Sequence, residues 1–153
     1  MVWDEKRQAR WQIIRIVAFA FLVAAPLVYL TVMYLVSIPP QEGGHIEMML
    51  YILLIVAIVE PATAMYIERF QITSYRANQP TNMNLDNLYF TLSIIKFAFV
   101  EVIYIFGLVV YFVSGNHNAM LYFYPIGIAW SFVYWPRQSK FEEFVRKIES
   151  SAL

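Results

Sequence analysis

Cysteine is absent from this chain, and histidine occurs only twice. Without thiols the chain cannot form disulfides, thiolate metal sites, iron–sulfur clusters or a cysteine nucleophile. Both histidines, His45 and His117, fall in short connections between apolar runs, where neither can ligate haem or a metal deep in a bilayer. We therefore expect no metal site and no cofactor.

Charged residues are scarce, and soluble catalytic features are missing. Only 14% of the residues are charged, 60% are hydrophobic, and the formal net charge is zero. This composition is typical of a polytopic membrane protein and offers no basic surface for nucleic acid. The chain has no glycine-rich phosphate loop and no serine elbow, and its polar segments are too short for a soluble catalytic domain. We therefore expect a protein that is not an enzyme and does not bind nucleic acid.

Long apolar runs predict an all-α integral membrane protein with one membrane domain over residues 1–153. A helix crosses the hydrocarbon core with about 20 apolar residues, and shorter spans are tolerated down to about 17. The first run is too long for the core of a cleaved signal peptide, so we expect it to be retained. The four predicted transmembrane helices are 13–36, 48–67, 88–113 and 119–135.

The segment 137–150 follows Pro136 and predicts a further, amphipathic helix. Helical spacing places its apolar residues on one side, which is typical of a helix on the membrane surface or against a partner. These residues are Phe141, Phe144, Val145 and Ile148.

The cations predict the topology. Four spans place the N-terminus, the second connection and the C-terminus on one side, and the positive-inside rule assigns that side to the cytoplasm. We therefore expect a multi-pass protein of the cell inner (plasma) membrane with both termini cytoplasmic. Of the eleven Lys and Arg residues, ten lie in or beside these three segments: Lys6, Arg7, Arg10, Arg15, Arg69, Arg76, Arg137, Lys140, Arg146 and Lys147.

Three ionisable residues fall inside predicted spans, where hydrocarbon solvates them poorly. Glu60 lies about 13 Å from the cytoplasmic end of its helix, and Lys96 lies about 12 Å from the same side on the next helix. Their similar depth predicts an intramembrane Glu60–Lys96 ion pair. Such a pair could shape a gate or proton path, or it could clamp two helices together, and both interpretations remain open.

Glu101 is the third ionisable residue. Five residues separate it from Lys96, which places the two about 140° apart around the helix, so Glu101 has no evident basic partner. Hydrocarbon favours the neutral form of a lone carboxyl group. Glu101 could then load and unload a proton, or donate a hydrogen bond to a backbone carbonyl or to a tyrosine such as Tyr104.

Two short motifs lie in the predicted hairpin 48–113: residues 101–110 read EVIYIFGLVV, and the connection at 76–80 reads RANQP. With these motifs the hairpin resembles the c subunit of rotary ATP synthases, whose ion-carrying helix and Arg-Gln-Pro loop are similar. The resemblance implies that Glu101 is the proton- or sodium-binding carboxyl group. The predicted helix 48–67 has no glycine, whereas the family's first helix is rich in glycine for close packing, so we expect no conventional tight ring.

Three functional hypotheses follow. The first is a non-enzymatic membrane subunit of a homo-oligomer or of a larger membrane complex, built around the c-subunit-like hairpin. The second is proton or ion translocation with Glu101 as the carrier and the Glu60–Lys96 pair shaping its access. The third is a quinone- or lipid-binding membrane module, because aromatic residues make up 18% of the chain and could line a groove. The expected partners are the lipid bilayer and other membrane subunits or further copies of the chain.

Overall fold

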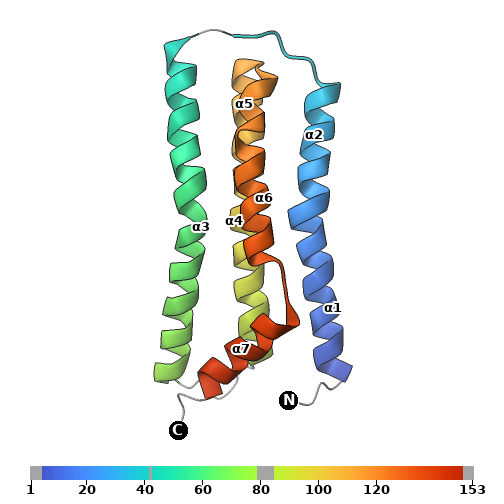
Figure 1. Cartoon of the computed structure of the whole chain (residues 1–153), viewed down its shortest axis with the longest axis vertical. Helices are drawn as coiled ribbons and strands as arrows, with labels where there is room; N and C mark the ends of the chain where they lie inside the picture. Colours follow the sequence, from blue (N-terminus) through green and yellow to red (C-terminus); the bar gives the residue numbers. More distant parts are fainter. Residues whose placement is uncertain (1–4, 42, 79–84, 150–153) are drawn as a thin grey trace.

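A computed structural model describes residues 5–41, 43–78 and 85–149, and every regular element in these residues is a helix (Figure 1). The chain begins with one rod, made of α1 (Glu5–Phe19), a single wide turn η1 (Ala20–Ala24) and α2 (Ala25–Leu35). The two longest helices are α3 (Gly44–Asn78) and α4 (Leu85–Ser114). Three shorter helices follow: α5 (His117–Leu121), α6 (Phe123–Tyr134) and α7 (Gln138–Glu149).

Three helices are long and apolar enough to cross a membrane, at 7–35, 44–75 and 85–114. They correspond to the first three predicted spans. The fourth predicted span, 119–135, is not one continuous helix, because the helical hydrogen bonding is interrupted at Tyr122 between α5 and α6, although the Tyr122 backbone keeps helical angles (φ −67°, ψ −29°). Pro125 explains this break, since a proline ring clashes with the carbonyl four residues earlier, and α5 ends there at Leu121. The 12 residues of α6 extend over only about 18 Å.

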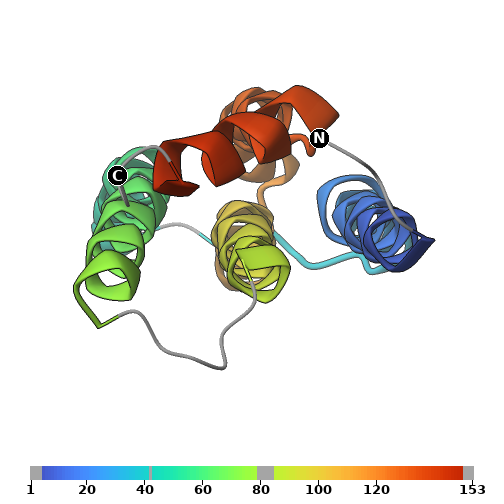
Figure 2. The same ribbon diagram turned by 90° about the horizontal axis from the view of Figure 1, so that it is seen from below.

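Helix α4 is the centre of the bundle and contacts all the other helices. In Figures 1 and 2 it lies between α3 and the α1–α2 rod, with α6 beside it. In the most apolar 18-residue stretch of each helix, 44% of the residues are buried in α4, 17% in α3 and 22% in the first rod. The outer two helices therefore present most of their apolar surface outward, as expected of helices that face lipid.

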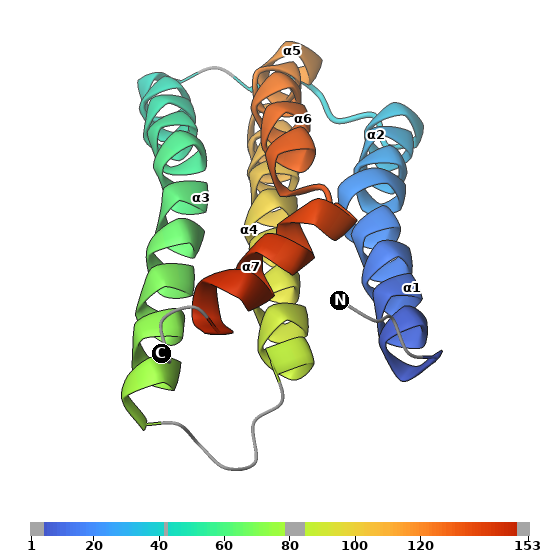
Figure 3. The same cartoon turned by 60° about the horizontal axis from the view of Figure 1, so that its bottom comes forward.

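Helix α7 covers the part of the bundle that the short α6 leaves open. It runs obliquely from the α1 side toward α3 (Figures 2 and 3). Its apolar side is buried, with Phe141 and Phe144 edge-on to the Tyr89 ring of α4 at centroid distances of 4.9 and 5.2 Å. The predicted amphipathic helix therefore exists, and its apolar side packs against this same chain.

One end of the bundle, which we name the charged end, holds the start of α1, the end of α3, the start of α4 and all of α7 (Figure 1). Arg7 of α1 pairs with Asp86 of α4 there, Nε to Oδ1 3.3 Å, and Arg10 donates to Asn87 at 2.6 Å. The opposite end carries the α2–α3 connection and α5. The cation-bearing segments are thus gathered at the charged end (Figure 1).

Candidate functional site

Lys96 pairs with Glu68 of α3, and the predicted Glu60–Lys96 pair is wrong. The Lys96 Nζ lies 2.9 Å from the Glu68 Oε2. The two side chains are 18% and 26% exposed, so the pair is partly shielded from solvent. The ammonium group also lies over the Tyr134 ring of α6, 5.7 Å from its centroid, within the range of a cation–π interaction.

Lys96 has a different partner from the predicted one because α3 and α4 end and begin at other residues than expected. The predicted spans ended at 67 and began again at 88, which set Glu60 level with Lys96. In the structure α3 continues to Asn78 and α4 begins at Leu85. Glu68 then lies ten residues before the end of α3, and Lys96 eleven residues after the start of α4. The longer α3 and the earlier start of α4 shift the α3 residue that lies level with Lys96 by about two turns, from Glu60 to Glu68.

Glu60 remains in the bundle and makes no ion pair with any residue that the structure describes. Its Oε2 is buried and has no hydrogen-bond partner among the residues that the structure describes. It lies about 12 Å along α3 from Glu68, toward the opposite end. The next residue, Pro61, accepts a hydrogen bond at its carbonyl from the Tyr134 hydroxyl at 2.6 Å, which ties α3 to α6.

Glu101 accepts a hydrogen bond from the Tyr29 hydroxyl of α2 at 2.6 Å. Tyr104, which the sequence suggested as a partner of Glu101, instead has its hydroxyl oxygen 3.3 Å from the Ser131 Oγ of α6. Seventy-two positions separate Tyr29 from Glu101, so no local spacing could have indicated this pair. The first span therefore supplies the partner of the carboxyl group, and the role of Glu101 as a proton carrier stays a prediction.

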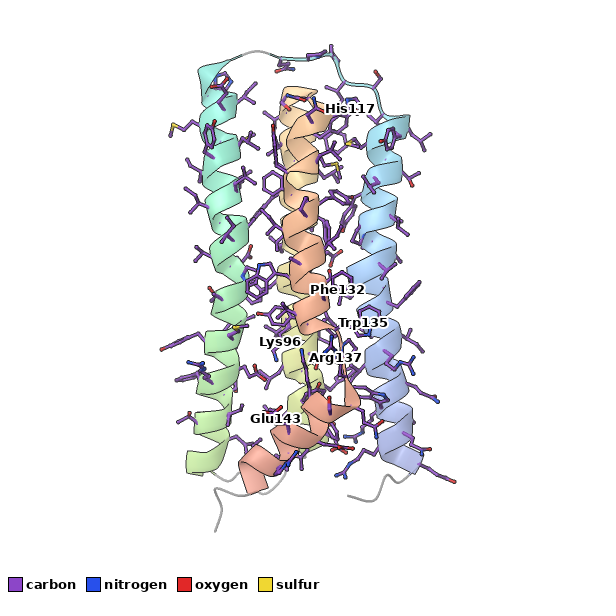
Figure 4. All side chains as sticks on the ribbon, viewed as in Figure 1. Lys96, His117, Phe132, Trp135, Arg137 and Glu143 are labelled. Carbon is purple, nitrogen blue, oxygen red and sulfur yellow. The ribbon has the colours of Figure 1, made fainter. Side chains whose placement is uncertain are left out.

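A pocket of about 360 Å³ lies at the charged end, where α3, α4, α6 and α7 meet. Figure 4 shows Lys96 of α4 and Glu143 of α7, which both belong to its wall. Its charged members are Glu68, Arg69, Lys96, Lys140 and Glu143. Its remaining members are mainly apolar or aromatic: Met65, Ile72, Tyr89, Ser93, Val133, Tyr134 and Phe144. The pocket thus combines a charged lining with an apolar one.

Lys140 connects α7 to the end of α6. Its ammonium group donates a hydrogen bond to the Val133 carbonyl, one of the carbonyls that a helix C-terminus leaves without a helical donor. Burial lowers the pKa of Lys140, and the nearby positive charges of Arg137 and Lys96 lower it further. Glu68 and Glu143 act in the opposite direction with smaller effects. The electrostatic environment of this ammonium group is therefore unfavourable to its own charge.

The sequence did not reveal the pocket, although it contained one signal. The fourth apolar run was short, and an amphipathic segment with its own cations followed it directly. A short helix next to a long one leaves space at one end of a bundle, and α7 only partly fills that space. The lining then joins residues from four helices that no single motif contains.

Comparison with families of known proteins, with curated proteins and with solved structures finds no match to the chain. The c-subunit resemblance therefore stays a prediction. Gly107, the glycine of that resemblance, faces α5 and α6 of the same chain, because a Cβ there would lie 3.2 Å from Met120 and Phe123. The function has to be inferred from the geometry of the pocket itself.

Proposed function

We propose that this chain is a non-enzymatic membrane module that holds the headgroup of an amphipathic membrane molecule in the pocket at its charged end. The observation that carries the proposal is the pocket's mixed lining, with charged groups from three helices beside aromatic and apolar walls. Its volume of about 360 Å³ lies within the range of pockets that take small ligands. Of the three hypotheses from the sequence, the lipid- or quinone-binding module agrees best with this geometry.

The rim of the pocket suits the apolar part of such a molecule. Met65 and Val133 belong to the wall and are 38% and 42% exposed, and Tyr66 and Phe70 beside Met65 on α3 are 70% and 63% exposed. We propose that the apolar part of the ligand lies along these exposed side chains on the outer surface of α3. A ligand could then place its polar group among the charges and its chain along the helix, with both parts in a favourable solvent.

The proposed orientation follows from the positive-inside rule, with the charged end toward the cytoplasm of a cell whose inner membrane holds the protein. We propose four crossings, in which α5 and α6 enter from the opposite end and α7 completes the return to the charged end. Assembly into a homo-oligomer or with other membrane subunits, and ion translocation through Glu101, stay predictions beside this proposal.

Native mass spectrometry after mild detergent extraction tests the proposal. Val133→Trp places an indole at the pocket wall, and we expect it to lower the bound fraction of a co-purified amphiphile at least fivefold by filling the headgroup space. Val56→Trp is the matched control, because Val56 is 38% exposed on α3 and does not line the pocket. Equal retention by both variants and by the unmodified protein would show that the pocket is not the binding site.

A further inference from the structure

The pocket carries an excess of positive charge. Arg69, Lys96 and Lys140 bring three cations from α3, α4 and α7, whereas Glu68 and Glu143 bring two carboxylates. The Lys96 ammonium is neutralised by Glu68 at 2.9 Å. Within the described residues Arg69 and Lys140 make no ion pair. Arg69 of α3 and Lys140 of α7 remain with one carboxylate, Glu143, so the pocket keeps a net charge of +1.

The position of Lys140 favours an anion beside it. The hydrogen bond to the Val133 carbonyl holds the ammonium group at the pocket wall. Desolvation and the neighbouring cations Arg137 and Lys96 lower its pKa, which disfavours the charged form. A negative charge within a few ångströms would offset both effects, as it does when basic pockets between membrane helices take acidic headgroups.

We propose that the pocket binds a phosphate group with a single negative charge, between Arg69 and Lys140, and that an acidic phospholipid supplies it. This inference rests on the proposed function and specifies its ligand. A guanidinium fits phosphate through paired N–H donors, and an ammonium adds a point charge. A phosphodiester carries one negative charge, which matches the net charge of +1 that the three cations and two carboxylates leave in the pocket.

Nanodiscs of defined composition test the inference with the full chain. The purified protein is reconstituted into mixtures of phosphatidylglycerol and phosphatidylcholine, and retained lipid is counted by native mass spectrometry. We expect a preference for phosphatidylglycerol that falls about fivefold in Arg69→Gln and, separately, about fivefold in Lys140→Gln. Each basic residue near a membrane surface contributes about 1 kcal/mol, which corresponds to this fivefold change. Arg146→Gln removes an exposed cation of α7 that does not line the pocket, and it should keep the preference.

The outcomes separate the ligand class from the proposed function. Retention of both lipids without preference, but lost in Val133→Trp, would overturn the acidic headgroup and leave the module intact. Absence of retained lipid in every protein would overturn the module. Displacement of phosphatidylglycerol by millimolar inorganic phosphate, but not by glycerol as the neutral control, would assign the pocket to free phosphate. It would contradict the proposal that a phospholipid supplies the phosphate group. An equal loss in Arg146→Gln would show a general surface effect instead of a site.

Discussion

Gly127→Ala should destabilise the folded bundle by about 2 kcal/mol, because overpacking a well-packed core costs about 1–3 kcal/mol. A Cβ at Gly127 of α6 would lie 2.5 Å from the Tyr104 Cζ and 2.6 Å from the Cε1. The Tyr104 ring cannot easily move away, since it is 1% exposed and packs edge-on against Tyr124 at a centroid distance of 5.1 Å. Either α6 must shift away from α4 or the ring must leave its rotamer. Unfolding by SDS titration in mixed micelles measures the loss.

Two further variants identify the cause of that loss. Gly44→Ala is the matched control at the first residue of α3, where an added Cβ meets nothing within 4 Å. It should change the unfolding free energy by less than about 0.5 kcal/mol. Combining Gly127→Ala with Tyr104→Leu should cost less than the sum of the two single changes, because the smaller side chain relieves the contact. Equal stability of Gly127→Ala and Gly44→Ala would contradict the close approach of α4 and α6.

Lys96→Met should cost about 2 kcal/mol, because it leaves the Glu68 carboxylate without its cation in a partly shielded position. Removing one partner of a fully buried pair costs about 3–5 kcal/mol, and the exposure of these side chains reduces that figure. A double-mutant cycle with Glu68→Gln, measured by the same unfolding titration, should give a coupling of about 1 kcal/mol.

Glu60→Gln provides the comparison that distinguishes the two possible partners. Its cycle with Lys96→Met should show coupling near zero, because the ammonium group of Lys96 lies against Glu68. Glu60→Gln alone should leave stability unchanged or raise it, since one oxygen of the carboxyl group is buried without a partner among the described residues. A strong coupling of Lys96 to Glu60 and none to Glu68 would show that α3 and α4 pair in the register expected from the sequence.

The long helices were predictable because apolar length and cation placement act over whole segments. A run of hydrophobic residues specifies a helix in lipid whatever its neighbours do, so the first three spans were found. The amphipathic spacing of Phe141, Phe144 and Ile148 likewise specified α7 and its buried side.

The side-chain partners were not predictable, because they depend on where helices end in polar sequence. The polar run after Ile67 contains no strong breaker before Pro80, and α3 continues through it to Asn78. The longer α3 and the earlier start of α4 together shift the residue level with Lys96 by about two turns, from Glu60 to Glu68. The bond from Tyr29 to Glu101 depends on how α2 packs against α4, and the break at Tyr122 depends on one proline. Register and packing decide these details, and a single sequence states neither directly.

The most direct test of the proposed function is nuclear Overhauser contact between lipid protons and valine methyl groups of the unmodified protein in phospholipid nanodiscs. The account predicts that Val133, at the pocket wall, contacts headgroup and glycerol protons. Val56, which is similarly exposed on α3 but lies outside the pocket, should contact only acyl-chain protons. Contacts of Val133 with acyl chains alone, or with water alone, would contradict the presence of a headgroup in the pocket.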